Sequence, residues 1–376
     1  GSLGDGHLLK TGAELTHHAF RSAATTDIAD LDKVQQEPTL LSSLDASAYL
    51  QDECQITPQL FTNIGLRGYY FASGKYSNLE PRISLSYLVT EDLSLKAEYS
   101  TANQALHLVS RNDIALPTDI WVPSTPQLKP ESATEWSAGT EASLAEHEYK
   151  VSVEGYYKEM HNLLEYKDTA NLSLHAPAES YFTSGDGSAY GVELFINKQI
   201  GRLTGWIGYT LSFTQRTFPE LNDGLPFNPR YDRTHDISIV TAYALNDRWN
   251  FGAVWVYGTG NAYTMPTGHY EFPSINAEPQ ETVDRNRLNY SRRNGYRLPA
   301  YHRLDLSASL KFSWFGLPWV FSMNIYNAYN HKNVFAQYIT PKSGYNPATN
   351  HDESSLELKR VTYFPILPTI GLSVKF

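Results

Sequence analysis

Five arginines lie within residues 263–299, although the chain as a whole has a formal net charge of −10. They are interspersed with tyrosines, and the group comprises Arg285, Arg287, Arg292, Arg293, Arg297, Tyr270, Tyr290 and Tyr296. Guanidinium groups bind carboxylates and phosphates through paired hydrogen bonds. The segment therefore predicts an anion-binding loop. The alternative is a solvated loop in which nearby acidic residues balance the charge, namely Glu271, Glu278, Glu281 and Asp284.

A second group of charges is denser and is expected where a strand leaves a loop. It consists of Arg230, Asp232, Arg233, His235 and Asp236, and Arg297, Arg303 and Asp305 form a similar set. These residues could form a ligand-binding rim. We favour the other interpretation, in which they form hydrogen-bonded ion pairs that fix the strands. Trp121, in the apolar segment 114–122, is a further candidate ligand contact, or else packs within its own loop.

The remaining residues indicate no catalytic chemistry, so we expect no enzyme and no cofactor. Histidines are scattered without metal-ligand spacing, and no nucleophile elbow, phosphate-binding glycine loop or HExxH motif occurs. Cys54 is the single cysteine, which excludes an intrachain disulfide. The net charge of −10 argues against a nucleic-acid partner.

The elements that must position these residues are β-strands, because apolar and small polar residues alternate through most of the chain. Leu304, Leu306, Ala308 and Leu310, for example, alternate with Asp305, Ser307 and Ser309. We expect about fourteen strands, at 7–20, 43–56, 59–73, 80–89, 93–105, 129–145, 148–160, 187–200, 203–216, 231–244, 249–262, 300–313, 318–331 and 366–376.

Connections between the expected strands alternate between tight turns and long loops. The turns span two to five residues. The other connections are long, at 21–42, 106–128, 161–186, 217–230, 263–299 and 332–365, and only 74–79 is short. This asymmetry is typical of an antiparallel β-barrel in a bacterial outer membrane, with short periplasmic turns and long extracellular loops. Aromatics make up 13% of the chain and charged residues only 19%, which suits membrane interfaces better than a soluble sandwich.

The chain ends on an amphipathic strand, residues 368–376, whose last residue is Phe376. We expect this strand to pair with the first strand and Phe376 to anchor at the membrane interface. Leu306, Leu310, Ile370 and Leu372 are expected to face lipid, and Asp305, Ser309 and Lys311 the lumen. No charged segment followed by an apolar one indicates a signal peptide, and Gly1-Ser2 is consistent with a piece of a longer chain.

Several segments resemble the C-terminal barrel of TonB-dependent outer-membrane receptors, particularly those of Bacteroidetes-like bacteria. They are residues 79–87, 227–238, 296–307, 324–333 and the closing strand. The resemblance implies that residues 1–376 form a single barrel domain containing roughly the last fourteen of about 22 strands. It also implies that the plug domain and the TonB-contacting box lie in absent sequence.

The resemblance further implies localisation in the cell outer membrane, with lipid and lipopolysaccharide as neighbours and TonB reached through the missing plug. The implied function is TonB-coupled uptake of a scarce small molecule or glycan, such as an iron chelate, haem, a vitamin or an oligosaccharide. Arg285, Arg287, Arg292 and Arg293 would bind this ligand or touch lipopolysaccharide phosphates. The alternative is a passive fourteen-stranded channel that is complete in itself.

Overall fold

A computed structural model describes residues 6–22, 39–109, 120–167, 178–271, 286–290, 292–346 and 351–374. The described chain is almost entirely β-structure, with two short 3-10 segments at Ala178–Tyr181 and Asn222–Gly224. In these ranges no helix has the length and apolar character needed to cross a membrane. Phe376 and Arg285 lie outside the described residues.

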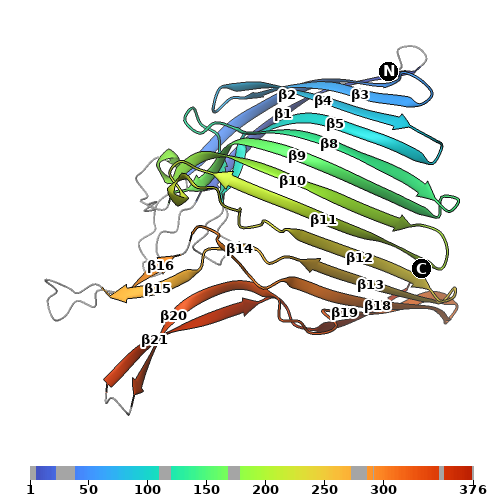
Figure 1. Ribbon diagram of the computed structural model, residues 1–376. Coiled ribbons are helices and arrows are strands. Elements are labelled where there is room, and N and C mark those ends of the chain that lie inside the picture. The colour runs from blue at the N-terminus through green and yellow to red at the C-terminus, as the bar shows by residue number, and fades with distance from the viewer. Residues whose placement is uncertain are drawn as a thin grey trace. The chain divides into compact units, whose positions relative to one another are not determined.

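The main feature is an antiparallel sheet of fourteen strands, in agreement with the expected fold (Figure 1). In sheet order these are β1 (His7–Ser22), β2 (Thr39–Gln55), β3 (Leu60–Phe71), β4 (Tyr76–Leu88), β5 (Leu93–Gln104), β8 (Glu131–Leu144), β9 (Tyr149–Tyr166), β10 (Phe182–Lys198), β11 (Leu203–Thr217), β12 (His235–Ala244), β13 (Trp249–Gly258), β18 (Tyr301–Trp314), β19 (Leu317–Tyr326) and β22 (Leu367–Val374). β1 and β22 stand at opposite ends of this order, so the expected pairing of last with first strand does not occur. The sheet formed by the described strands is therefore open.

The chain divides into two compact units, which are described separately. The first comprises residues 1–111, 118–196 and 212–226, and the second comprises residues 112–117, 197–211 and 227–376. The organisation of residues 1–376 as a single domain stays a prediction.

Three of the expected long loops contain paired strands. The pairs are β6 (Leu106–Val109) with β7 (Ile120–Pro123), β14 (Ala262–Tyr263) with β17 (Tyr296–Arg297), β15 (Pro266–Glu271) with β16 (Asn286–Tyr290), and β20 (Val334–Asn346) with β21 (His351–Thr362). Within the second unit, β20 and β21 extend beyond the ends of β18 and β19 (Figure 1). Two strands that leave a sheet side by side satisfy their backbone groups by pairing with each other.

Strand register sorts the side chains of the second unit onto two faces. Leu306 lies opposite Ala253 and Ile325, and Leu310 lies opposite Trp249 and Phe321. Ile370 and Leu372 are opposite Met323 and Phe321, on the same face. Asp305, Ser309 and Lys311 occupy the other face, beside residues such as Val254, Ser322 and Val320. The expected segregation of these residues onto opposite faces is therefore confirmed.

The first unit has the same two-sided pattern, and ion pairs join neighbouring strands on its polar face. Lys96 and Lys150 both bind the carboxylate of Glu141, each at 2.9 Å, and Lys158 binds Glu135 at 2.6 Å. These pairs join neighbouring strands across β5, β8 and β9. Opposite charges on adjacent strands stabilise one pairing register over its alternatives.

Tight turns close the hairpins at one end of the strands. The turn between β18 and β19 has only Phe315 and Gly316 between the paired residues Trp314 and Leu317. Both central residues have positive φ, 51° and 72°, as a two-residue hairpin turn requires. Phe315 is 84% exposed and its ring lies beside that of Trp314, with centroids 4.8 Å apart. Aromatic side chains therefore gather at this end of the strands.

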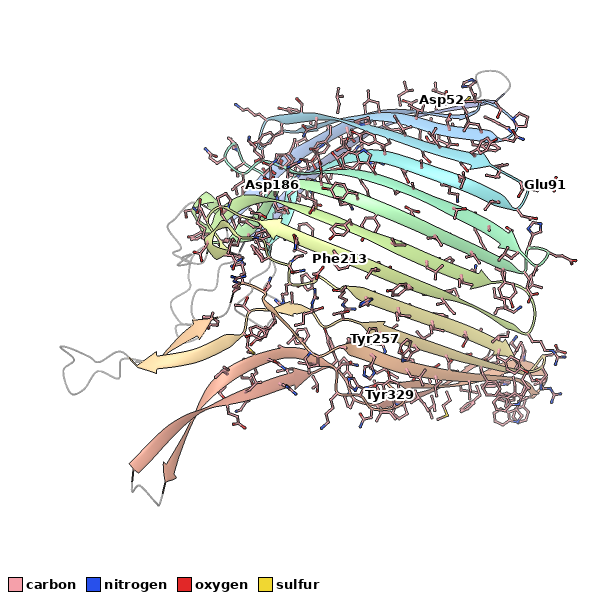
Figure 2. All side chains as sticks on the ribbon, viewed as in Figure 1. Asp52, Glu91, Asp186, Phe213, Tyr257 and Tyr329 are labelled. Carbon is pink, nitrogen blue, oxygen red and sulfur yellow. The ribbon has the colours of Figure 1, made fainter. Side chains whose placement is uncertain are left out.

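The long connections lie at the opposite ends of the same strands. In the first unit, Figure 2 shows Glu91 at the tight turn between β4 and β5 and Asp186 toward the loop ends of β9 and β10. Asp186 accepts a hydrogen bond from the His161 ring at 2.9 Å. Functional groups carried by the long connections are thus separated from the tight turns by the length of a strand.

Candidate functional site

A buried carboxylate organises the loop end of the second unit. The Asp232 side chain is 1% exposed and binds the Arg297 guanidinium, which is 32% exposed. Arg297 also donates to the backbone oxygens of Asp232 at 2.8 Å and Gly260 at 3.2 Å. Asn228 donates its side-chain amide to the same carboxylate at 2.9 Å. These bonds tie the segment after Phe227 to the β14–β17 pair, because Arg297 belongs to β17.

Gly260 allows this arrangement because its backbone passes very close to the chain near Leu298. A Cβ atom at residue 260 would lie 1.6 Å from the Leu298 carbonyl oxygen, closer than any two such atoms approach. Glycine is the residue that permits close passage of two backbones. Substitution here would therefore displace the strand that carries Arg297.

Asn294 supports the turn that carries two of the predicted ligand-binding arginines. It is 6% exposed and has φ of 50°. Its backbone amide donates to the Thr264 hydroxyl at 2.9 Å, and its side-chain amide donates to the Asn228 carbonyl at 2.8 Å. Asparagine tolerates this left-handed conformation better than most residues. The turn is therefore connected through Asn228 to Asp232.

Arg292 and Arg293 lie together on this turn. Arg292 is exposed, and the Arg293 guanidinium lies over the Phe227 ring, 5.3 Å from its centre. Arg287 is opposite Tyr270 in the β15–β16 pair. The structure thus brings two of the four predicted arginines together and places a third on the adjoining hairpin. Their role in ligand binding stays a prediction.

Trp121 belongs to the other unit, in β7, opposite Leu108 of β6. Its side chain is 54% exposed. Val109 and Val122, the neighbours along these two strands, are instead buried in an apolar cluster with Leu128 and Leu164. The hairpin is therefore anchored through its valines, and Trp121 is presented on its opposite side.

The charged segment 230–236 is held by neighbours from several strands. Arg233 donates to Asn261 and Asp236, each at 3.3 Å, and its guanidinium lies over the Tyr301 ring. The His235 ring is 3.0 Å from the Tyr209 hydroxyl. Arg230 lies over the ring of Tyr231, 5.8 Å from its centre. Arg233 and His235 thus contact β18 and β11, and the strand-fixing role of the segment stays a prediction.

A second cluster of polar side chains lies where the pairing of β18 and β19 ends. Arg303 donates to Asp305 at 2.9 Å and to the hydroxyls of Tyr301 and Tyr326, each at 2.8 Å. Asp305 accepts the backbone amide of Asn327 at 2.9 Å, just past the last paired residues of the two strands. The carboxylate thus replaces the missing strand partner of that amide.

Asparagines in the segment 327–333 connect this cluster to the residues just before β22, a role that the sequence pattern did not predict. Asn327 is fully buried and bonds to both the amide and the carbonyl of His331, and to the carbonyl of Phe364. Asn333 exchanges two hydrogen bonds with the backbone of His302, and Asn330 accepts from the Ile366 amide. The three-residue spacing of these asparagines is the sequence feature that could have indicated their structural role.

In the first unit, a comparable carboxylate lies at the separation of β4 and β5. Glu80 is 1% exposed and accepts from Arg67 at 3.1 Å and from the Asn103 backbone amide at 2.9 Å. Asn103 follows the last β4–β5 pair, Arg82 with Ser100, while β5 continues beside β8. The sequence analysis did not single out Glu80, because it lies in a regular polar-face pattern.

His107, Ser124 and Glu131 have the order of contacts found in hydrolytic triads. The His107 ring is 2.9 Å from the Ser124 hydroxyl and 3.2 Å from the Glu131 carboxylate, although the second contact lacks good hydrogen-bond direction. Both His107 and Ser124 are completely buried. No substrate can reach a nucleophile in that position, so the group serves to hold β6 against its neighbours. Among the described residues, no group of three or more His, Cys, Asp or Glu side chains is placed to hold a metal ion.

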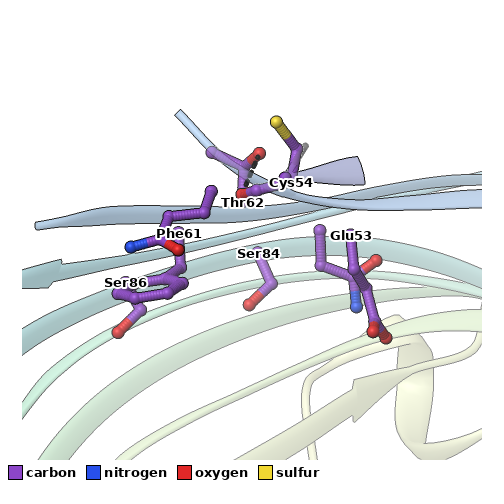
Figure 3. Close-up of a pocket in the computed structure, with 9 residues that line it drawn as sticks. Glu53, Cys54, Phe61, Thr62, Ser84 and Ser86 are labelled. Atoms are coloured by element: carbon purple, nitrogen blue, oxygen red, sulfur yellow. Dashed lines mark hydrogen bonds between the residues drawn. The ribbon is translucent and has the colours of Figure 1, made fainter. Parts of the chain in front are cut away.

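A shallow cavity of about 360 Å³ lies on the polar face of β2, β3 and β4, near their tight-turn ends (Figure 3). Its lining includes Glu53, Phe61, Ser84 and Ser86. Phe61 lies opposite Ser86 in the register, and Glu53 opposite Asn63. The cavity is open, and Glu53 is already engaged by Lys10 at 2.5 Å. It offers hydroxyl and amide groups but no assembled reactive centre.

Outside the main sheet, Tyr263 of β14 contacts β20 of the β20–β21 pair. Its hydroxyl donates to the Gln337 carbonyl of β20 at 3.2 Å. Burial, with a smaller effect of the Tyr290 phenol, raises the pKa of Tyr263 above its usual value. The phenol therefore stays protonated and remains a donor at physiological pH. This bond joins the arginine-rich segment to the β20–β21 pair.

Comparison with known proteins agrees with this architecture. The family model for the TonB dependent receptor-like β-barrel matches residues 2–330. No curated protein sequence matches the chain significantly. Solved structures that share the fold include the ferripyoverdine receptor of the outer membrane of Pseudomonas aeruginosa, with 15% identity and a TM-score of 0.58 over 88% of this chain and 42% of that one.

Two further structures give similar values. The siderophore receptor PirA from Acinetobacter baumannii shares 13% identity at a TM-score of 0.58, over 87% of this chain and 48% of that one. The FrpB iron transporter from Neisseria meningitidis shares 16% identity at 0.58, over 88% and 49%. The chain thus spans less than half the length of the receptors it matches. The extent of the family match shows that this chain belongs to the TonB-dependent receptor β-barrels, which are outer-membrane transport proteins and not enzymes.

Proposed function

We propose that the chain forms part of the wall of a receptor that takes up an iron chelate across the outer membrane with energy supplied through TonB. The observation that carries the proposal is the family match over residues 2–330. The names of the structural neighbours favour iron among the candidate ligands, since they include siderophore and ferripyoverdine receptors and an iron transporter. Haem, a vitamin or a glycan would be the other ligands to compare.

In this proposal, the arginine-rich connection between β13 and β18 captures the ligand. Ferric iron prefers oxygen donors, and chelates built from such donors present anionic oxygens at their surface. Arg292 and Arg293 lie on a turn that Asn294 and Asp232 support, and Arg285 and Arg287 precede it in the sequence. Guanidinium groups suit anionic oxygens because they donate two hydrogen bonds at once. Trp121 is proposed separately, as an apolar ligand contact on the β6–β7 hairpin of the first unit.

The polar clusters would hold the strands while the loops bind. Asp232 with Arg297, and Arg303 with Asp305, already satisfy their charges within the protein. Loops supported by a rigid scaffold are the usual carriers of specificity. Coupling to TonB is proposed to occur through a plug domain beyond residues 1–376. A passive channel is not favoured, because the family match is to receptors of the TonB-dependent class.

The experiment that tests the proposal compares two sets of variants in the full-length receptor. Replacing Arg285, Arg287, Arg292 and Arg293 by Ala should reduce uptake of ⁵⁵Fe-loaded chelates with unchanged surface expression. A matched control replaces Arg248 by Ala, since this exposed residue lies in the tight turn at the other end of the strands. Uptake of haem, a vitamin or a glycan instead of iron chelates would correct the ligand class. Equal uptake by wild type and loop variant would eliminate the arginines as the binding site.

A further inference from the structure

A groove of about 300 Å³ runs across the apolar face of β12, β13, β18 and β19 in the second unit. Small residues form its floor, and larger apolar side chains form its walls. Thr241 and Ala253, which are paired across β12 and β13, form one part of the floor. Ala308 forms the other part and lies in the next row of paired residues, which is nearer to the tight turns. Phe251, Leu306 and Met323 flank them in the same two rows. The depression therefore runs obliquely across the strands.

The walls of the groove are large and exposed. Phe251, Leu306 and Met323 are each 40% exposed, so they rise beside the alanines and do not cover them. Phe251 is supported by Trp249, with the two rings nearly parallel at 5° and their centroids 5.8 Å apart. A stacked pair of aromatic rings makes a rigid wall. The groove is therefore a feature of the folded surface, with walls made by side chains that pack on one another.

The surroundings of the groove determine what can occupy it. This face carries Leu306, Leu310, Ile370 and Leu372, and in an outer-membrane barrel the apolar face of the wall contacts lipid. The groove is thus continuous with the membrane-contacting surface, and its lining offers no charged group. An apolar chain is the occupant that such a surface stabilises.

The position of the groove along the strands selects the leaflet. Ala253 is four residues from Trp249, which begins β13 after the tight turn, so the two lie within about 13 Å along the strand. One leaflet contributes about 15 Å of the hydrocarbon core. The tight turns are periplasmic in this class of barrel, which places the groove in the inner leaflet. That leaflet of the outer membrane consists of phospholipid, whereas lipopolysaccharide occupies the outer one.

We propose that this groove binds one acyl chain of an inner-leaflet phospholipid. The four strands span three interstrand spacings, about 14 Å, which is close to the extent of the acyl chains in one leaflet. Arg248 is exposed in the turn immediately before Trp249, where it can attract the phosphate of the same lipid. The groove thus provides an ordered lipid site on a surface that otherwise contacts lipid without selection.

The test uses the full-length receptor in vesicles of phosphatidylethanolamine and phosphatidylglycerol that contain a phosphatidylethanolamine with a photoreactive acyl chain. Cross-linked peptides are mapped by mass spectrometry. We expect labelling of the β13 and β18 peptides to exceed that of the β4 and β5 peptides by about tenfold, which corresponds to about 1.4 kcal/mol. Uniform labelling of all four strands would overturn the proposal.

Variants that fill the groove provide the second arm. Ala253→Leu and Ala308→Leu, made separately, should reduce β13 and β18 labelling to the level of the other strands. Ala242→Leu is the matched control, because Ala242 lies on the opposite face of β12 between Thr241 and Tyr243. Folding of each variant is checked by heat-modifiable migration. Undiminished labelling in both filled variants would refute the site, and stronger labelling by a photoreactive lipid A would reassign it to lipopolysaccharide. Neither readout depends on ligand uptake.

Discussion

Removal of the Arg297 guanidinium should open the arginine-rich turn to protease. Arg297→Ala removes the charged partner of the Asp232 carboxylate, which is 1% exposed and also accepts from the Asn228 side-chain amide. Loss of one partner from a buried ion pair costs roughly 3–5 kcal/mol. Because Arg297 itself is about one-third exposed, we take the lower end, about 3 kcal/mol. Two backbone contacts, to Asp232 and Gly260, are lost with it.

This perturbation is local, so its effect should appear as local opening near residues 292–295. If the free energy of local opening falls by about 3 kcal/mol, the population of the open form rises about a hundredfold. Trypsin cleaves after arginine, and Arg292 and Arg293 lie on the affected turn. When opening and closing are fast, the cleavage rate follows the population of the open form. Cleavage after these two residues in the folded receptor should therefore be about a hundredfold faster in Arg297→Ala than in wild type.

Two controls separate this effect from general destabilisation. Asp232→Asn keeps an acceptor for Arg297 and Asn228, so its cleavage rate should rise much less than that of Arg297→Ala. Arg248→Ala lies at the opposite strand end and should leave cleavage after Arg292 and Arg293 unchanged. If Arg297→Ala is cleaved at the wild-type rate, the ion pair does not hold the turn, and the structural role assigned to Asp232 is refuted.

Three further predictions concern stability and assembly. Leu306→Arg should lower the free energy of unfolding of the receptor by about 2–4 kcal/mol, measured by urea titration in lipid. Ser307→Arg, on the polar face, should lower it by much less. Equal losses in the two variants would contradict the face assignment. Asn327→Ala removes three hydrogen bonds made by a fully buried side chain and should cost about 3 kcal/mol in the same titration. Asn324→Ala, at an exposed position in β19, should be nearly neutral. Deletion of Phe376 should reduce assembly in the outer membrane, measured by fractionation and heat-modifiable migration, and normal abundance would argue against an anchoring role.

Most of the strands could be predicted because period-2 alternation is a direct consequence of two different faces. Leu306 and Asp305, for example, fall on opposite faces in any regular strand, and the register confirms it. A tight turn was likewise expected over residues 313–317, and the structure shortens it to Phe315 and Gly316. The hairpin β20–β21 was expected to be a loop, because Pro341 and Gly344 interrupt its pattern.

The candidate site was predicted less completely. The arginines could be predicted as candidates because they are concentrated in one segment of an acidic chain. The residues that position them could not be predicted. Asn327 and Asn294 carry side chains that usually face solvent in turns, and only the three-dimensional course of the chain shows that both are buried. Glu80 is hidden for a different reason: its burial depends on β4 and β5 separating at Arg82, which local sequence does not indicate.

Energy-dependent uptake of an iron chelate is tested most directly by one measurement. Cells that express the full-length receptor as their single route for a ⁵⁵Fe-loaded chelate are compared with otherwise identical cells that lack TonB. We predict that both strains bind the chelate at the surface and that only the strain with TonB accumulates ⁵⁵Fe in the periplasm. Equal accumulation in the two strains would contradict the account and indicate a passive channel.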